Sequence, residues 1–300
     1  MIRPAYNLGW KIASVVNGIS SRSILSTYET ERRQIAQDLI AFDYKFSRLF
    51  SGRPARDEDD LEGVNMAEFK TAYEKGNHFT SGISVTYGPS IVVAGSSSDN
   101  ETFIDDVTPK RKAASKQHLA KNIPLGARMP SYQVLNQCDA RPWQFQEILK
   151  SDGRWRVVIF AGDITFPRQK ERIKAIGRQL AHPKFFPRRF THWSKPIDSV
   201  IEVLTIHSAP RHEVDLFDFP EALRPFSPET GWDYWKIYVD AQSHHEGHGQ
   251  AYLNYSVDPT EGCLVVLRLD QHVSYIGGLE DLDAVDMFFS EFLKPVNTEY

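Results

Sequence analysis

Three unbroken apolar runs and a closing amphipathic helix predict an α/β protein whose larger part is built on a mixed sheet. The runs cover residues 156–160, 200–206 and 264–267, and such runs are typical of strands that are covered on both faces. A helical pattern lies between the first two runs. The third run begins a hairpin that turns at Asp270–Gln271, and a helix at residues 282–293 follows it.

The N-terminal part of the chain is predicted to be a helical pair. Residues 6–17 place apolar side chains on one face, and Gly18 is a natural helix stop. A second, long helix is expected to start near Ser23, a candidate N-cap, and to end near Gly52. Its apolar stripe recurs at intervals of three, four or seven residues, and polar residues are expected to fill the other positions. The stripe consists of Tyr28, Ile35, Leu39, Phe42, Phe46 and Leu49, and the polar residues are Glu29, Glu31, Arg32, Arg33, Gln37 and Lys45.

The middle of the chain carries weaker signals. Residues 53–63 are predicted to form an acidic, solvated connector, and residues 66–75 a short helix. Residues 83–93 have a strand-like composition but contain Gly88–Pro89, so we expect an edge strand or a broken strand. Residues 95–116 are polar and of low complexity, and we expect a flexible, disordered loop there.

The second part of the chain, residues 121–300, is predicted to hold the α/β domain. Beyond the runs named above, we expect a helix at residues 168–180, a strand at residues 236–240 and a polar histidine loop at residues 243–250. The resulting order of strand, helix, strand, strand, hairpin and helix is compatible with a thioredoxin-like topology.

The totals exclude several classes of protein. The 300 residues are 41% hydrophobic and 25% charged, as in an ordinary soluble globular protein. A net charge of −4 gives no electrostatic reason to expect nucleic acid or an anionic membrane as a partner. The two cysteines, Cys138 and Cys263, are far apart and form no CxxC, which favours a reducing compartment. No apolar run is long enough to span a membrane, and the N-terminus is not typical of a signal peptide. We therefore expect a cytoplasmic protein.

The histidine loop is the local feature that most suggests chemistry. A zinc site of the HExxH type needs two histidines four residues apart on a helix, with the glutamate reaching the metal-bound water. The spacing from His245 to His248 is one residue short of this pattern, and the glycines of the loop argue against a helix. A hydrogen-bonded polar loop is therefore favoured over a metal site built from His244, His245 and His248.

Two further sets of candidate catalytic groups can be assembled. Ser208, His207 and Asp215 supply the residue types of a hydrolase triad, but the chain has no GxSxG elbow, so a hydrolase is not favoured. Cys138 and Cys263 lie in apolar stretches and are expected to be small core residues rather than nucleophiles.

Five segments of the chain carry recognisable motifs. They are YNLGWK at residues 6–11, YETERRQIAQDLI at 28–40, PLGARMP at 124–130, HEGHGQAY at 245–252 and VVLRLDQHVSYIG at 265–277. In their order and spacing they resemble the C-terminal part of fungal phenol 2-monooxygenases, which are FAD-dependent aromatic hydroxylases. The last segment resembles the family's arginine-proline-aspartate turn, with Leu269 in place of proline, His272 in place of tyrosine and Tyr275 in place of tryptophan.

The resemblance implies a division of the chain. Residues 1–120 would be a helical remnant of the flavin and substrate domain, and residues 121–300 a thioredoxin-like C-terminal dimerisation domain. It also implies that the intact family uses FAD, NADPH and molecular oxygen.

The sequence also departs from the family at the flavin site. No GxGxxG turn, which such an enzyme needs to hold the FAD pyrophosphate, occurs in the 300 residues. Pro4 stands where the family has an aspartate. Gly162–Asp163 follows a strand, but the histidine and glycine-rich loop of the second flavin motif do not follow it, so we expect a strand-end turn there. No cysteine is near this turn, which argues against thioredoxin-type disulfide exchange.

The leading hypothesis is a truncated phenol 2-monooxygenase-like protein that lacks the FAD-binding half and serves as a dimerisation or interaction module. We expect a homodimer or pairing with a full-length relative, and no cofactor for this chain alone. No catalytic, cofactor-binding or metal-binding residue is assigned. Two alternatives stay open. The chain could be one piece of a split FAD-dependent monooxygenase, or a flavin-free enzyme that binds an aromatic or polyketide-like small molecule in a pocket between the helical part and the α/β domain.

Overall fold

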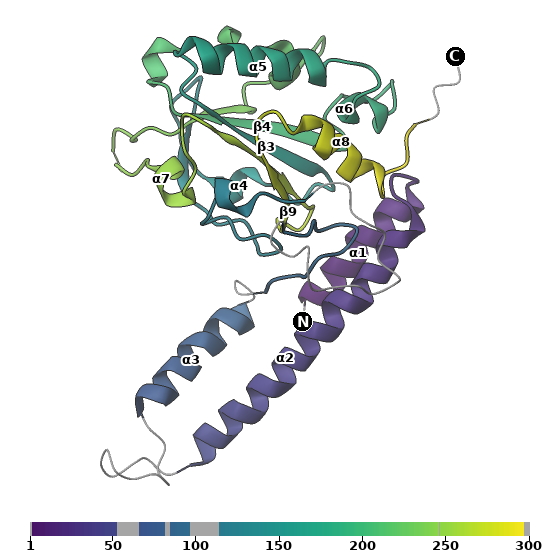
Figure 1. The fold of residues 1–300 in the computed structure, drawn as a ribbon, viewed down its shortest axis with the longest axis vertical. Coiled ribbons are helices and arrows are strands. Elements are labelled where there is room, and N and C mark those ends of the chain that lie inside the picture. The colour runs from purple at the N-terminus through teal and green to yellow at the C-terminus, as the bar shows by residue number, and fades with distance from the viewer. Residues whose placement is uncertain (1, 53–65, 82–84, 97–113, 246, 297–300) are drawn as a thin grey trace.

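The computed structural model describes residues 2–52, 66–81, 85–96, 114–245 and 247–296, and it consists of an α/β body with a projecting helical arm (Figure 1). Helices α2 (Ser26–Ser51) and α3 (Met66–Ser81) form the arm. Helix α1 (Ile2–Val16) lies where α2 meets the body. None of the helices in the described ranges combines the length and the apolar character that crossing a bilayer requires.

A seven-stranded mixed sheet forms the centre of the body, in the order β2-β1-β7-β4-β3-β8-β9. Strands β3, β4 and β7 are parallel to one another, and the neighbouring pairs outside this group are antiparallel. The strands are β1 (Gln133–Asn136), β2 (Pro142–Gln144), β3 (Trp155–Gly162), β4 (Ile201–His207), β7 (Ile237–Val239), β8 (Cys263–Leu267) and β9 (Val273–Gly277). A separate two-stranded sheet pairs β5 (Phe226–Ser227) with β6 (Gly231–Trp232).

Short helices cover both faces of this sheet (Figure 1). One face carries α5 (Pro167–Leu180), α6 (Phe186–Arg189) and α8 (Leu282–Ser290), and the other carries α4 (Phe145–Ile148) and α7 (Ala251–Tyr255). Alternate residues of β3 enter the two cores, because successive side chains of a strand point to opposite faces. Val157 packs in the core beneath α5 and α8, and Val158 packs in the core beneath α4 and α7. All residues of β3 are buried, as its unbroken apolar run predicts.

The thioredoxin-like topology is confirmed. Its four central strands lie in the order β4-β3-β8-β9, with α5 connecting the parallel pair β3 and β4 and α8 following the hairpin. Strands β1, β2 and β7 extend the sheet at the β4 edge.

Several predicted elements differ from those observed. Helix α2 begins at Ser26, and Ser23 is not its N-cap, because residues 22–25 form a 3₁₀ turn ahead of the helix. Helix α3 continues to Ser81, beyond the predicted end at residue 75. The predicted strand at residues 83–93 is wrong for residues 85–93, which make only isolated bridges such as Thr86 with Ala127. The connector at residues 53–63 and most of the predicted loop, residues 97–113, lie outside the described residues.

The two ends of the predicted loop at residues 95–116 form backbone hydrogen bonds with the hairpin. The backbone N–H of Ala94 donates to the carbonyl of Ser274 at 2.7 Å, and that of Lys116 donates to the carbonyl of Ile276 at 2.8 Å. The Ser115 N–H also donates to the Gly95 carbonyl at 2.8 Å. These bonds occupy the free edge of β9, an edge that would otherwise expose unpaired backbone groups.

The end of β3 supplies a test of the fold. Gly162 has φ +73°, and an added Cβ would lie 2.1 Å from the carbonyl oxygen of Pro259. Gly153 has φ +85° with open space around it. We expect Gly153→Ala to lower the free energy of unfolding by about 1 kcal/mol, from backbone strain alone. Gly162→Ala should lose at least about 2 kcal/mol, because the clash with backbone adds to that strain. Urea denaturation measures both, and equal losses would contradict the packing described at this turn.

Candidate functional site

The site begins with Arg268, the residue that follows β8 in the hairpin. Its side chain is fully buried, and two carboxylates surround it. Nη1 donates to Oε1 of Glu31 at 2.6 Å, and Nη2 donates to Oδ2 of Asp270 at 2.7 Å. A second bond to each carboxylate, Nη2 to Glu31 at 3.2 Å and Nε to Asp270 at 3.0 Å, makes both contacts bidentate. Bidentate pairs of this kind are the strongest that arginine forms with carboxylates.

Glu31 brings the helical part into the same cluster. It lies on α2, is buried, and accepts hydrogen bonds from Lys11 Nζ at 2.9 Å and Asn7 Nδ2 at 2.8 Å on α1. The prediction that Glu31 fills an outer position of α2 is therefore wrong. One carboxylate thus connects α1, α2 and the hairpin of the α/β domain.

Aromatic rings enclose the guanidinium. The Arg268 Cζ atom lies 5.2 Å from the ring centre of Trp10 and 4.8 Å from that of Tyr87. Trp10 also packs edge-on against Trp155 at the start of β3, with ring centres 6.0 Å apart. Cation–π contacts of a desolvated guanidinium strengthen the cluster and exclude water from it.

The hairpin turn holds the second carboxylate in place. The turn at Asp270–Gln271 is confirmed, with Gln271 in the left-handed region at φ +67°. The Gln271 N–H donates to the Arg268 carbonyl at 2.9 Å, and the Arg268 N–H donates to the His272 carbonyl at 2.8 Å. Nδ1 of His272 lies 3.2 Å from Oδ1 of Asp270 and 3.1 Å from the Asp270 carbonyl oxygen. Because both neighbours are acceptors, Nδ1 carries the proton.

Burial and charge shift the pKa values of this cluster in opposing ways. Burial alone would raise the pKa of Asp270, but the charge of Arg268, followed by that of His272, outweighs it and holds the pKa far below its ordinary value. Burial also works to raise the pKa of Glu31, and Arg268 and Lys11 again outweigh it, so the net shift is downward. Burial, with help from Arg268, lowers the pKa of Lys11 to about 8 in spite of its pairing with Glu31.

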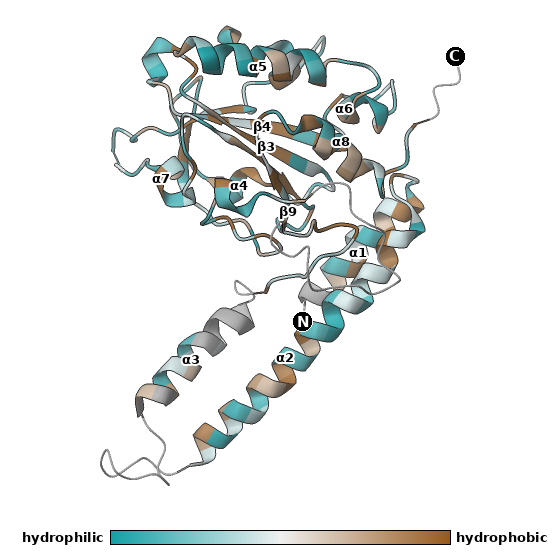
Figure 2. Ribbon diagram, in the orientation of Figure 1, coloured by the Kyte–Doolittle hydropathy of each residue, from teal (hydrophilic) through white to brown (hydrophobic). Residues whose placement is uncertain are grey.

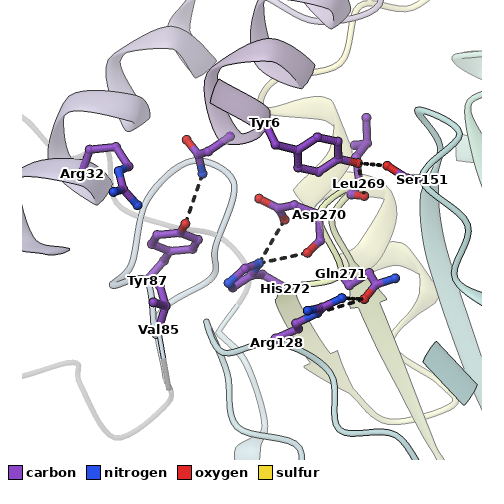
Figure 3. Close-up of a pocket in the computed structure, with 11 residues that line it drawn as sticks. Tyr6, Arg32, Val85, Tyr87, Arg128, Ser151, Leu269, Asp270, Gln271 and His272 are labelled. Atoms are coloured by element: carbon purple, nitrogen blue, oxygen red, sulfur yellow. Dashed lines mark hydrogen bonds and ion pairs between the residues drawn. The ribbon is translucent and has the colours of Figure 1, made fainter. Parts of the chain in front are cut away.

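A cavity of about 240 Å³ lies beside this cluster, between the helical part and the hairpin (Figure 3). This is the position that the pocket of the flavin-free hypothesis requires. Its lining comes from α1, α2, the segment after residue 84, the hairpin, and the loops that contain Arg128 and Ser151. The lining residues are Tyr6, Asn7, Arg32, Val85, Tyr87, Arg128, Ser151, Leu269, Asp270, Gln271 and His272.

The predicted triad does not assemble. His207 is fully buried, and its Nε2 lies 2.8 Å from Oε1 of Gln137. Burial lowers its pKa to about 3, so it stays neutral. Asp215 instead caps a 3₁₀ turn by accepting from the Phe217 N–H, and Ser208 Oγ is buried without a hydrogen-bond partner among the described residues.

The two cysteines differ from each other. Cys263 is buried in β8 as predicted, and burial raises the pKa of its thiol above the ordinary range. Cys138 is exposed in the turn after β1, so its prediction as a core residue is wrong. Burial of part of its surface, followed by the charges of Asp139 and Asp215, raises the pKa of the Cys138 thiol. Neither thiol is poised as a nucleophile, because a thiolate needs a lowered pKa.

The histidine loop forms a turn on the surface. His244, His245 and His248 are exposed, and the rings of His244 and His245 meet edge-on, with centres 4.7 Å apart. Glu246 lies outside the described residues. Among the residues that are described, no group of three or more histidine, cysteine or carboxylate side chains is arranged to hold a metal ion.

Comparison with known proteins gives matches to two family models, one near the N-terminus and one over most of the rest of the chain. A family model described as the phenol hydroxylase C-terminal dimerisation domain matches residues 85–297, and a model described as an FAD binding domain matches residues 2–43. The phenol 2-monooxygenase fsqG of Aspergillus fumigatus is 36% identical over 288 residues, which cover 96% of this chain and 43% of that relative. The FAD-dependent monooxygenase terD of Aspergillus terreus is 33% identical over 297 residues, which cover 98% of this chain and 45% of that relative.

One solved structure has the same fold. The flavin-dependent monooxygenase PieE, in complex with FAD and substrate, superposes with a TM-score of 0.50 at 14% identity, over 96% of this chain and 43% of that protein. The chain therefore spans less than half the length of the relatives it matches.

The buried cluster predicts a large effect for a change that preserves shape. Glu31→Gln removes the negative charge shared by Arg268 and Lys11 and leaves two buried cations with Asp270 alone. Breaking a buried ion pair in this way costs about 3–5 kcal/mol, and we expect the free energy of unfolding to fall by that amount in chemical denaturation. The matched control is Glu29→Gln on the same helix, where the pair with Arg33 is exposed. Its effect should stay within about 0.5 kcal/mol.

The same variant gives the pH dependence. The pKa of Glu31 in the folded protein lies below its ordinary value of 4.5, so the unfolded chain binds this proton more tightly. The stabilisation by Glu31 is therefore complete above about pH 5 and is lost as the pH falls through the folded pKa. The difference in unfolding free energy between the wild type and Glu31→Gln should shrink from pH 7 towards about pH 3. A difference that stays constant over this range would show that the charge of Glu31 is not what stabilises the cluster.

Proposed function

The chain belongs to the phenol hydroxylase family, whose C-terminal dimerisation domain it carries, and we propose that these 300 residues serve as the dimerisation and interaction part of an FAD-dependent aromatic hydroxylase. In this role it joins the last helices of a flavin domain to a thioredoxin-like dimerisation domain. Its partner would be a second copy or a full-length relative.

The buried cluster around Arg268 is the observation that supports this proposal. Glu31 lies in the range matched by the FAD binding domain, and Arg268 lies in the range matched by the dimerisation domain. Their bidentate contact makes the helices and the α/β body one unit. A unit of this kind holds the two matched regions in a fixed relative position. A dimerisation domain needs such a connection if it is to orient a flavin domain to which it is attached.

Exposed apolar residues on the helices indicate that a further surface packs there. Val16 on α1 is 78% exposed, and Ile40, Tyr44 and Phe50 on α2 are 68–75% exposed. Figure 2 shows hydrophobic stretches along α2 where it projects from the body. Contiguous exposed apolar area is typical of a surface that binds another protein surface.

We infer that this chain alone does not hold FAD, although residues 2–43 match an FAD binding domain. A flavin enzyme positions its cofactor with a glycine-rich turn at a helix N-terminus, and the 300 residues contain no GxGxxG. On α1, Asn7 and Lys11 point their polar groups at Glu31 rather than at a cofactor site. Because flavin catalysis depends on a cofactor that the protein positions, we assign no step of hydroxylation to this chain. We place the protein in the cytoplasm, as its cysteine usage favours.

An FAD titration tests the catalytic half of the proposal. We expect the purified chain to show no flavin absorbance, and added FAD to keep its free fluorescence, because no phosphate-binding turn is present. A relative that contains the whole flavin domain serves as the positive control. A stoichiometric yellow complex would overturn the inference that this chain alone does not hold FAD.

The oligomeric state tests the other half. We expect light scattering after gel filtration to give twice the mass of one chain. The matched control is Ile40→Glu together with Tyr44→Glu on the arm, which should leave the dimer intact if the α/β domain forms it. A monomeric wild type would contradict a homodimer, and a monomeric arm variant would place the contact on the arm.

A further inference from the structure

The cavity beside the hairpin has walls of two kinds. Tyr6, Val85 and Leu269 give it apolar surface, and Arg32, Arg128 and His272 give it polar groups (Figure 3). An apolar cavity with a few converging polar groups is the usual form of a small-molecule site. Its volume of about 240 Å³ lies below the range of about 300–1,000 Å³ for drug-sized ligands, so its ligand would be smaller than those.

Arg32 places an unpaired positive charge at this cavity. Its side chain is half-buried and makes no hydrogen bond or ion pair with another residue that the structure describes. The two neighbouring carboxylates, those of Glu31 and Asp270, do not pair with Arg32, because both bind Arg268 bidentately. Figure 3 shows Arg32 reaching from α2 to the side of the cavity where Tyr87 lies. A partly buried guanidinium without a carboxylate is uncommon, since burying a charge is unfavourable unless it is paired.

The other charges of the lining do not neutralise Arg32. Arg128 adds a second guanidinium, which donates to Oε1 of Gln271 at 2.6 and 3.0 Å. Asp270 carries the one carboxylate among the lining residues, and Arg268 and His272 already hold it. Among the described lining residues, Arg32 is therefore the charge that is left for a ligand to neutralise.

Two buried polar atoms of the lining also lack partners. Asn7 is 2% exposed, and its Oδ1 has no hydrogen-bond partner in the described part of the chain, because its Nδ2 faces Glu31. His272 is 8% exposed, and its Nε2 likewise has none, because its Nδ1 faces Asp270. Unpaired polar atoms are rare in packed cores and cluster where a site has a ligand to accommodate.

We propose that this cavity binds a small carboxylate with an apolar body, whose carboxylate pairs with the guanidinium of Arg32 while its body lies against Tyr6, Val85 and Leu269. A guanidinium matches a carboxylate with two parallel hydrogen bonds. The apolar walls disfavour a free phosphate or another fully hydrated anion, which would lose its water without compensation. This site goes beyond the dimerisation role and does not depend on it, because both the helices and the hairpin that form it lie within one chain.

Benzoate and benzamide test the charge requirement. The two probes have nearly the same shape, and only benzoate carries a charge. By calorimetric titration we expect benzoate to bind the wild type with one site per chain, and benzamide at least tenfold more weakly. No binding of benzoate at millimolar concentration, or equal binding of both probes, would overturn the proposal.

A pair of neighbouring arginines tests the position of the site. Arg32→Gln should weaken benzoate binding at least tenfold, and Arg32→Lys, which keeps a positive charge, should weaken it less. Arg33→Gln is the matched control, because Arg33 is the next residue of α2 and its side chain is 68% exposed and paired with Glu29. Equal loss in Arg32→Gln and Arg33→Gln, or no loss in Arg32→Gln, would overturn the assignment. Circular dichroism checks that each variant is folded, and these outcomes are independent of whether the chain dimerises or binds FAD.

Discussion

The buried guanidinium of Arg268 is the constraint on which the arrangement of the molecule depends. A charge with no exposure to water is stable only where opposite charges and hydrogen bonds replace the lost hydration. Asp270, two residues away, supplies half of that replacement, and Glu31, 237 residues away in the sequence, supplies the other half. Without α2 docked against the hairpin, Arg268 would keep Asp270 as its one carboxylate partner among the described residues. Lys11 and Asn7 extend the requirement to α1, because they satisfy the remaining lone pairs of Glu31.

The thioredoxin-like body makes this cluster rigid. Strand β8 is buried along its whole length and is held on both sides, by β3 and by β9. The register shift between Val266 and Leu267 lies just before Arg268, where the ladder to β9 gives way to the turn. Bulges of this kind redirect a strand and re-aim the side chains beyond it. The rings of Trp10 and Tyr87 pack against the guanidinium, and through Trp155 these aromatic contacts continue into the core beneath α8.

The sequence predicts those parts of the fold that local pattern determines. The apolar runs that became β3, β4 and β8, the amphipathic stretch that became α5 and the turn at Asp270–Gln271 could all be identified, because burial on both faces or on one face leaves a periodic signal. The burial of Glu31 could not be predicted. Helical periodicity identifies one apolar stripe, and a glutamate outside that stripe is expected to be exposed to water. Its burial depends on a partner that only the tertiary structure brings near. The prediction that Cys138 is a core residue was wrong for a different reason. Its apolar neighbours belong to β1, while Cys138 lies in the exposed turn after that strand. Helix α7 was missed because its five residues are too few to show a period.

The helical arm is packed on one face and leaves apolar side chains exposed on the other. Phe46 of α2 stacks on Phe69 of α3 with ring centres 6.1 Å apart, and Phe50 of α2 packs against the same ring at 5.8 Å, so the two helices share an aromatic seam. A pair of helices can bury only the stripes that face each other. Ile40 and Tyr44 lie outside this seam and stay 71% and 75% exposed, and covering a large apolar side chain is worth about 1.5–3 kcal/mol. One face of the arm is therefore packed between α2 and α3. The other face keeps large apolar side chains exposed, which favours association with another apolar surface. The body does not cover these residues, because α2 contacts it through Glu31 and Ile35, more than one helical turn before Ile40.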